Sequence, residues 1–351
     1  MSAGRSKIAA VLVLALATFA AGCGGVKPLE TGDGAAEPAS CSGPRTAASD
    51  GWVTPIARHV TPALPATITD FTGEGQTIRA ADRVLALDTY GTLATTVYAL
   101  GLGDRLVGRD VSTGVPALQH LPVVTHNGHE LNAEAILDLD PDVILTDYSI
   151  GPLEVQLQLQ DAGIPVIIMD AARNRAVIPE QIRAVAAALG VPRQGEQLVD
   201  QVKAGIADAE AEVAELAPSD PKHRIRMVFL YMRGTAGVYY WFGRGSGADD
   251  LIDALDGVDV ATEAGLAGAR ALNAEGLVKS APDLFLMMTH GLESVGGVDG
   301  LLDVAGVADT TAGADGCVVD MDDAQILSFG PQFPATLRAL AEAIYGRTDR
   351  T

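Results

Sequence analysis

The same fifteen-residue pattern occurs once in each half of the chain. LNAEAILDLDPDVIL covers residues 131–145, and LNAEGLVKSAPDLFL covers residues 272–286, 141 positions later. Seven of the fifteen positions are identical, including the Leu-Asn-Ala-Glu start and the Pro-Asp pair. The length of 351 residues also exceeds the size at which a single hydrophobic core keeps growing. The repeat therefore predicts two lobes built on one plan.

Composition and charge exclude several classes of protein. Hydrophobic residues make up 48% of the chain and aromatic residues 5%, which permits a large aliphatic core and excludes a disordered or fibrous protein. The 24 basic residues face 45 acidic ones, so the net charge is -21. A field of that sign repels phosphate backbones, and we expect no nucleic acid as a partner.

The N-terminus has the features of a lipoprotein signal. Arg5 and Lys7 precede an apolar run at 8–21, and Gly22 and Cys23 follow it. The run is too short for the roughly 20 apolar residues that cross a bilayer. We therefore predict a signal peptide at 1–22, lipidation of Cys23, and an extracytoplasmic protein anchored to the outer face of the cytoplasmic membrane.

A flexible tether is expected at 23–80, because this segment is rich in Gly, Pro, Ala, Ser and Thr and has little periodicity. With Cys23 lipidated, Cys41 and Cys317 remain, and an oxidising compartment allows a disulfide between them. Since Cys41 lies in the predicted tether, the sequence leaves that pairing open.

Beyond the tether, short strands alternate with helices, a pattern that builds parallel sheets. In an N-terminal lobe at 81–190 we predict strands at 83–87, 105–107, 143–146 and 166–169 and helices at 92–100, 132–139 and 153–162. In a C-terminal lobe at 219–348 we predict strands at 226–230, 238–241 and 284–288 and helices at 248–255, 274–280 and 333–345. The fold class is α/β, with two Rossmann-like lobes.

A long amphipathic helix is predicted between the lobes, within 191–218. Its apolar residues recur at spacings of three and four. They are Leu198, Val202, Ile206, Ala209, Val213 and Leu216. One continuous helix limits hinge motion, so we expect a rigid connection and a ligand cleft between the lobes.

Side chains suited to binding follow the predicted strands, where ligands collect in parallel sheets. Tyr231 and Arg233 follow the strand at 226–230, whereas His126 and His129 follow an extended segment in the first lobe. His290 follows the strand at 284–288. Taken alone, each of these residues is more often an ordinary loop or packing residue than a ligand.

Several runs in combination resemble one family. VYALGLGDRLVGRD, the two Leu-Asn-Ala-Glu repeats, ESVGGVDGLL and LSFGP, spread over 81–345, are similar to hemin-binding substrate-binding lipoproteins of bacterial ABC importers. These belong to the iron-siderophore and cobalamin binding-protein superfamily. The resemblance implies heme as transported cargo, an ABC permease dimer with its ATPase as partner, a heme donor protein, and no catalysis.

The resemblance also implies how iron is held: by a histidine of the first lobe and a tyrosine of the second, with an arginine two residues after the tyrosine. Tyr231 and Arg233 fit that spacing. A phenol with a pKa near 10 must lose its proton to bind ferric iron well, and a neighbouring guanidinium favours the phenolate. We favour His129 over His126 as the partner, because the Asn127-Gly128 turn projects it toward the cleft.

Further residues are candidates for contact with a macrocycle. His126 and Met288 are expected near the cleft, although a methionine in such a position more often packs in the hydrophobic core. Heme propionates need donors, for which Arg173, Arg175 and Arg244 lie in predicted cleft loops. The aromatic residues at 239–242 pack either on a macrocycle or partly in the core.

Glu134 and Glu275 fall in the first turn of the two repeated helices, after the predicted N-caps Asn132 and Asn273. Acids there interact favourably with the helix dipole, by about 0.3 to 1 kcal/mol. The resemblance implies an additional role, because similar proteins dock on a two-subunit permease through one glutamate from each lobe. We hypothesise that Glu134 and Glu275 are these docking acids.

Other functions remain in competition. A ferric siderophore or cobalamin receptor has the same fold, and a siderophore site is expected to hold a cleft arginine cluster. A heme enzyme of the peroxidase or catalase type also pairs a tyrosinate with an arginine. A zinc hydrolase is disfavoured because the chain lacks HExxH, and nucleotide binding because GRGSG at 243–247 lacks the Lys-Ser/Thr of a P-loop.

Overall fold

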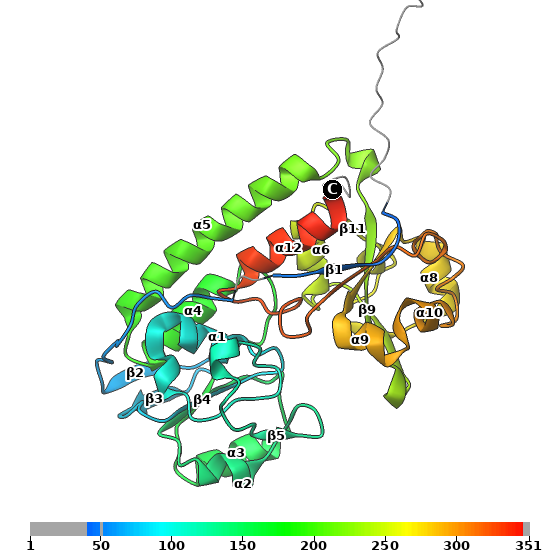
Figure 1. Ribbon diagram of the computed structural model, residues 1–351. Coiled ribbons are helices and arrows are strands. Elements are labelled where there is room, and N and C mark those ends of the chain that lie inside the picture. The colour runs from blue at the N-terminus through cyan, green and yellow to red at the C-terminus, as the bar shows by residue number, and fades with distance from the viewer. Residues whose placement is uncertain (1–40, 50–51, 347–351) are drawn as a thin grey trace, which may run out of the picture. The chain divides into compact units, whose positions relative to one another are not determined.

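The computed structural model describes residues 41–49 and 52–346 (Figure 1). The predicted signal peptide, Cys23 and the first part of the predicted tether lie outside these ranges. Within them, no helix is both long enough and apolar enough to cross a bilayer.

The N-terminal lobe is a three-stranded parallel sheet with helices, drawn mainly in blue to green in Figure 1. The strand order is β4 (Val84–Leu87), β7 (Val143–Thr146) and β8 (Val166–Ile168). Its helices are α1 (Thr92–Val97), α2 (Ala133–Asp138), α3 (Leu153–Asp161) and α4 (Ile178–Ala188). Two hairpins complete it: β2 (Ala66–Thr69) with β3 (Gly75–Ile78), and β5 (Thr125–His126) with β6 (Glu130–Leu131).

One predicted strand of this lobe is wrong. Residues 103–105 form a short helical turn, and Leu106 makes a single parallel bridge to Val84. Helical turns also extend α1 over Tyr98–Leu102 and cover Pro116–Leu118. The segment is nevertheless aligned beside β4, so the polar residues after it still reach the carboxyl end of the sheet.

The C-terminal lobe is a seven-stranded mixed sheet in the order β1-β14-β13-β9-β10-β12, with β11 paired to β9. The strands are β1 (Arg45–Ala47), β9 (Arg226–Arg233), β10 (Val238–Phe242), β11 (Val258–Asp259), β12 (Ala269–Ala271), β13 (Leu284–Met288) and β14 (Val318–Met321). The helices are α6 (Ala248–Ala254), α7 (Val260–Glu263), α8 (Ala274–Ser280), α9 (Thr289–Ser294), α10 (Gly297–Leu302), α11 (Thr311–Ala314) and α12 (Phe333–Tyr345), with short turns at Pro221–His223 and Gly234–Ala236.

The repeated sequence builds the same junction in both lobes. The predicted N-caps are confirmed, since Asn132 accepts a hydrogen bond from the amide of Ala135 and Asn273 from that of Gly276. Each repeated helix is followed by a residue with φ of 44°, Asp140 or Ala281, directly before the proline.

Aspartates then tie each junction to the neighbouring strand. The carboxylate of Asp142 accepts a hydrogen bond from the amide of Arg83, and that of Asp283 accepts one from the amide of Arg226. The two arginines donate in return to the carbonyls at the ends of α2 and α8. Much of the repeat is therefore explained by helix-to-strand geometry.

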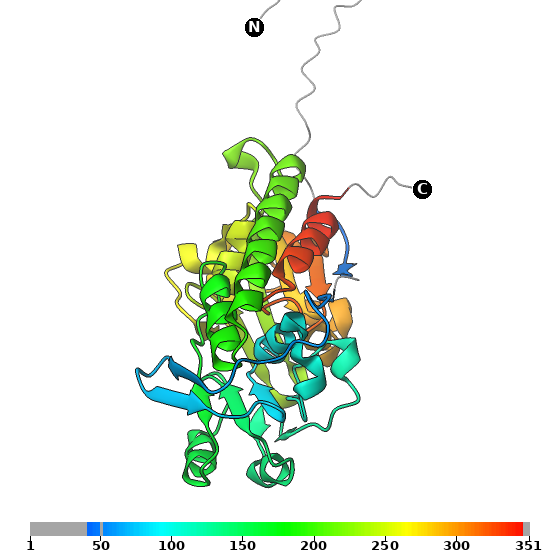
Figure 2. The ribbon, with the colours of Figure 1, turned by 90° about the vertical axis from the view of Figure 1, so that its left-hand side faces the viewer.

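The predicted connecting helix is confirmed as α5 (Pro192–Leu216). Its 25 residues span about 38 Å at 1.5 Å per residue. One end packs against α4 of the first lobe and the other against α12 of the second, as Figures 1 and 2 both show.

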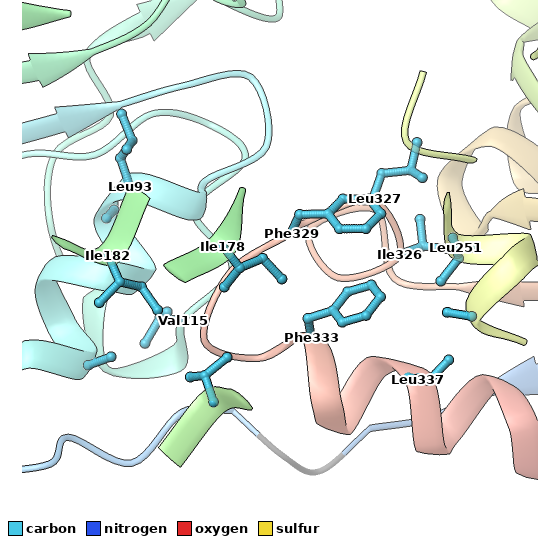
Figure 3. Close-up of a cluster of buried hydrophobic side chains, with 14 of the residues drawn as sticks. Leu93, Val115, Ile178, Ile182, Leu251, Ile326, Leu327, Phe329, Phe333 and Leu337 are labelled. Carbon is cyan, nitrogen blue, oxygen red and sulfur yellow. The ribbon is translucent and has the colours of Figure 1, made fainter. Parts of the chain in front are cut away.

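A single apolar core continues from one lobe into the other (Figure 3). Ile178 of the first lobe lies beside the stacked rings of Phe329 and Phe333, whose centroids lie 4.8 Å apart, and Leu93 and Ile182 belong to the same cluster. Opening the lobes would expose this apolar surface to water, with a free-energy cost of about 25 cal/mol for each Å². The predicted rigid two-lobed α/β architecture is therefore confirmed.

The predicted tether extends too far. The described residues between 41 and 80 are built into the fold: β1 pairs with β14, the amide of Ile56 bonds to the carbonyl of Ala99, and β2 pairs with β3. Small and polar residues with weak periodicity are consistent with a tether, but here their backbone groups bond to partners far away in sequence. The prediction failed because it considered local composition alone.

Cys41 and Cys317, which are 276 positions apart in the sequence, form a disulfide with Cα atoms 5.5 Å apart. Replacing both by serine is expected to lower the free energy of unfolding by about 2–5 kcal/mol, since the bond restricts a very long loop of the unfolded chain. Urea denaturation with and without reductant measures the effect. A wild-type protein equally stable in both conditions would contradict the expectation.

Candidate functional site

A cavity of about 720 Å³ lies between the two lobes, within the usual range for small-molecule sites. The first lobe contributes residues from the loops that follow its strands, and the second contributes the end of β9 and the starts of loops beside it. The lining includes Thr89, Tyr90, Ser112, Thr113, Gln119, His129, Tyr231, Arg233, Phe242, Met288, His290 and Asp323.

The wall from the second lobe is a stack of flat groups on one face of β9. Phe229, Tyr231 and Arg233 share that face because side chains alternate along a strand. Phe242 of β10 lies between the rings of Phe229 and Tyr231, with centroids 5.3 and 5.7 Å away. The stack leads from the buried Phe229 to the cavity and holds the Tyr231 ring in one plane.

The guanidinium of Arg233 lies over the Tyr231 ring, with Cζ 4.5 Å from the ring centroid. Its Nη2 donates to Oδ2 of Asp323 at 2.9 Å and its Nη1 to the carbonyl of Met232 at 2.9 Å. The predicted neighbourhood of Tyr231 and Arg233 is therefore present, as a cation on the ring face. Among the described residues the Tyr231 hydroxyl has no hydrogen-bond partner and is free to bind a ligand.

His129 faces the cavity from the first lobe. Its Nδ1 lies 3.3 Å from Oγ of Ser112, whereas Nε2 has no partner within the part of the chain that the structure describes. Burial, and then the charge of Arg233, lower the pKa of His129. A neutral imidazole with a free nitrogen is the form that binds a metal.

A glycine brings Ser112 to this position. Gly91, the N-cap of α1, has φ of 65°, and a Cβ atom there would lie 2.5 Å from the backbone oxygen of Ser112. The absence of a side chain at 91 thus lets the 112–114 loop pack closely beside the cavity.

His126 lies outside the cavity lining. It is exposed in the β5–β6 hairpin, with Nε2 3.6 Å from a carboxylate oxygen of Glu130. Met288 and His290 do line the cavity, and Met288 is 7% exposed. The expected cleft contact is thus observed for Met288 and not for His126, because the hairpin directs the latter to solvent.

A buried ionic cluster packs against Tyr90, which lines the cavity. Arg173 donates to Oδ2 of Asp88 at 3.1 Å and to Oδ2 of Asp147 at 2.9 Å, and its Cζ lies 4.6 Å from the centroid of the Tyr90 ring. Each member follows a different strand of one parallel sheet, so the carboxyl ends bring them together. Tyr90, a wall of the cavity, rests on this cluster.

Burial raises the pKa of Asp88 to about 6, although Arg173 opposes the shift. Burial and the charge of Asp88 raise the pKa of Asp110 to about 7. The oxygens of Asp110 accept hydrogen bonds from the amide of Asp88 and the hydroxyl of Thr113. These carboxyls therefore hold protons at pH values where exposed ones are ionised.

A family comparison identifies the architecture around this cavity. The model of the periplasmic binding protein family matches residues 89–324. The chain belongs to that family.

Solved structures are similar to this periplasmic binding protein over most of its length. The crystal structure of the heme binding protein HmuT is 42% identical, with a TM-score of 0.85, covering 89% of this chain and 100% of that one. Further HmuT structures carry alanine in place of a histidine, a tyrosine, and an arginine two positions after the tyrosine. The periplasmic heme-binding protein RhuT from Roseiflexus sp. RS-1 is 35% identical, with a TM-score of 0.70, covering 76% of this chain and 98% of that one.

A curated relative comes from Bacillus subtilis (strain 168). The uncharacterized ABC transporter substrate-binding lipoprotein YvrC is 26% identical over 298 residues, which are 83% of this chain and 89% of the relative. These comparisons confirm the family resemblance that the sequence motifs predicted.

The remaining arginine candidates of this binding protein lie away from the cavity. Arg173 is buried in the ionic cluster, and Arg175 is paired with Asp250, Asp253 and Glu210. Arg244 is exposed in the loop after β10 and is not among the lining residues. None of the three contributes to the cavity wall, because two are neutralised by carboxylates and the third faces solvent.

The aromatic block at 239–242 is divided by the alternation of β10. Phe242 lines the cavity, Trp241 is buried in the core of the second lobe, and Tyr240 is exposed. Tyr239 lines a separate surface groove.

Sequence reasoning missed Tyr90, the 112–114 loop and Asp323. Tyr90 and the loop carried a usable signal, since each follows a predicted strand and ligands collect there. Asp323 also follows a strand, β14, that the sequence analysis did not predict.

Proposed function

We propose that this binding protein holds ferric heme in the cavity between its lobes and delivers it to an ABC-type permease, without catalysis. The observation that carries the proposal is that His129 and Tyr231, from opposite lobes, line one cavity of about 720 Å³, where Nε2 of His129 and the Tyr231 hydroxyl have no hydrogen-bond partner among the described residues. A flat macrocycle entering this space would present iron to both.

The chemistry of the two side chains suits ferric iron. Tyr231 supplies a hard oxygen ligand once its phenol is ionised, and His129 supplies a neutral nitrogen. Phe242 and Met288 offer apolar and polarisable surface to the macrocycle. The residues that line the cavity therefore fit an iron porphyrin as cargo.

The comparisons support the same reading. HmuT and RhuT are named as heme-binding proteins, and the three residue types replaced in HmuT are those of His129, Tyr231 and Arg233, with the same two-residue step from tyrosine to arginine.

Rival functions fit the cavity less well. A siderophore receptor is expected to have an arginine cluster, yet Arg233 is the sole arginine among the described residues that line the cavity. In a heme enzyme an axial position stays open for the oxidant, whereas ligation by both His129 and Tyr231 fills the two axial positions.

The two histidines give a test of the proposal. Replacing His129 by alanine is expected to weaken hemin binding by at least about 100-fold and to shift the Soret band, because an axial ligand is lost and loss even of a supporting residue costs about 10- to 100-fold. His126→Ala is the matched control and is expected to keep the wild-type spectrum, because its side chain lies outside the cavity. Hemin titration followed by visible absorption measures both; a wild-type spectrum for His129→Ala would contradict the site.

Location and anchoring complete the proposal. A periplasmic binding protein acts outside the cytoplasm, where a heme donor protein can supply it. We extend this to a lipid anchor on Cys23, supported by the signal-like N-terminus and by the lipoprotein relative YvrC.

Glu134 and Glu275 are proposed to dock the permease. Both are exposed in the first turns of α2 and α8, and neither has an ion-pair partner within the described ranges. One glutamate at the equivalent position of each lobe suits a permease with two equivalent halves.

Replacing Glu134 and Glu275 together by alanine is expected to reduce heme uptake by cells at least about 10-fold while hemin binding in solution stays unchanged, because each lost ion pair at an interface weakens association. Growth on hemin as iron source, compared with purified-protein titration, measures the two effects. Unchanged uptake would contradict the docking role of the two glutamates and leave the proposed heme site unaffected.

A further inference from the structure

Asp323 connects three parts of the cavity wall. It lies in the loop after β14, and its Oδ2 accepts a hydrogen bond from Nη2 of Arg233 at 2.9 Å. Its Oδ1 accepts one from the backbone amide of His290, at the start of α9, at 3.0 Å. The same oxygen lies 3.4 Å from Nδ1 of the His290 ring. Both carboxylate oxygens are therefore engaged, each by a different element.

The other contacts of Arg233 are weaker anchors. Nη1 donates to the carbonyl of Met232, the adjacent residue, and Nη2 lies 3.8 Å from the sulfur of Met288. A neutral carbonyl and a thioether hold a guanidinium less strongly than a carboxylate does, because hydrogen bonds between charged groups are roughly twice as strong as neutral ones. Within the described ranges Asp323 is the one ion-pair partner of Arg233.

The position of Arg233 matters because it packs on Tyr231. An arginine side chain has many rotamers, and fixing one of them needs an anchor. With Asp323 in place, Cζ of Arg233 lies 4.5 Å from the Tyr231 centroid.

We propose that Asp323 is a positioning residue of the heme site: it fixes the guanidinium of Arg233 on the Tyr231 ring and thereby sets how firmly Tyr231 holds iron. The inference rests on the proposed function, since it assumes that Tyr231 is the iron ligand. Asp323 acts through Arg233, and its carboxylate has no direct part in holding the cargo.

A double-mutant cycle tests this role. Asp323→Ala, Arg233→Ala and the double variant are loaded with hemin, and two quantities are measured: the rate of hemin transfer to apomyoglobin and the energy of the tyrosinate-to-iron charge-transfer band. Asp323→Ala is expected to accelerate transfer about 10-fold and to move the band to its position in Arg233→Ala. The double variant is expected to match Arg233→Ala, because the second change then removes nothing further.

Control variants separate positioning from folding. Glu293→Ala removes an exposed acid from α9, outside the cavity, and is expected to behave as wild type. Asp323→Glu keeps the charge and is expected to restore most of the wild-type rate. Asp323→Asn keeps the size of the side chain and removes its charge. It replaces Asp323→Ala in the test if the alanine variant does not fold, and the same faster transfer and band shift are expected.

The outcomes distinguish this inference from the proposed function. A wild-type protein without any tyrosinate band would overturn both. A wild-type protein with the band, combined with additive effects of Asp323→Ala and Arg233→Ala, or with no effect of either, would overturn the positioning role and leave heme binding standing.

Discussion

Replacing Tyr231 by alanine is expected to weaken hemin binding by at least about 100-fold and to abolish the tyrosinate-to-iron charge-transfer band. Substitution of residues that merely support a metal ligand already lowers the affinity by about 10- to 100-fold. Loss of the ligand itself is therefore expected to lower the affinity by at least about 100-fold. The stack of Phe229 and Phe242 remains in place without the phenol, so the fold of β9 and β10 is expected to persist. Hemin titration and circular dichroism on the same sample measure both quantities.

Tyr240 provides the matched control. It lies directly opposite Tyr231 in the β9–β10 register, and its side chain is 37% exposed and outside the cavity. Tyr240→Ala is therefore expected to retain the wild-type affinity and spectrum. Equal losses from Tyr231→Ala and Tyr240→Ala would show that the hairpin, rather than the phenol, is what hemin binding requires.

Replacing Arg173 by methionine is expected to lower the free energy of unfolding by about 3–5 kcal/mol at pH 8, because it leaves the carboxylates of Asp88 and Asp147 buried without their cation. Urea denaturation measures the loss. Hemin binding is expected to weaken as well, since Tyr90 loses the group beneath its ring. Arg183→Met, which breaks exposed ion pairs with Glu180 and Glu196, serves as the control and is expected to change stability little.

The loss from Arg173→Met is expected to shrink as the pH falls. Burial holds the pKa of Asp88 near 6 and that of Asp110 near 7, above the ordinary 3.8, so the folded protein binds protons that the unfolded chain releases. This contribution is fully present below about pH 4 and is lost as the pH rises toward 7. At pH 5 the Asp88 carboxyl left without Arg173 takes up a proton and tolerates burial; an equal loss at pH 5 and pH 8 would contradict this explanation of the cluster.

The features predicted correctly from the sequence are those encoded locally. The spacing of apolar residues predicted a helix within 191–218, where α5 (Pro192–Leu216) lies, and Asn132 and Asn273 marked the starts of α2 and α8. Tyr231 and Arg233 lie on the same face of one strand because they are two residues apart, which requires no knowledge of the rest of the fold.

The features that were missed depend on partners far away in sequence. Arg173 looked like a cleft donor, but it is buried because Asp88 and Asp147 converge on it from two other strands. Asp323 is separated from Arg233 by 90 positions. The segment after Cys41 resembles a linker in composition, yet it joins a sheet whose other strands lie more than 170 residues later.

A hemin titration of the purified wild-type protein, with cobalamin and a ferric siderophore as competitors, is the direct test of heme as the cargo. We expect saturation at a defined stoichiometry, a shifted Soret band together with a tyrosinate-to-iron band, and no displacement by either competitor. A Soret band that stays at the position of free hemin, or displacement by cobalamin or the siderophore, would contradict heme as the cargo.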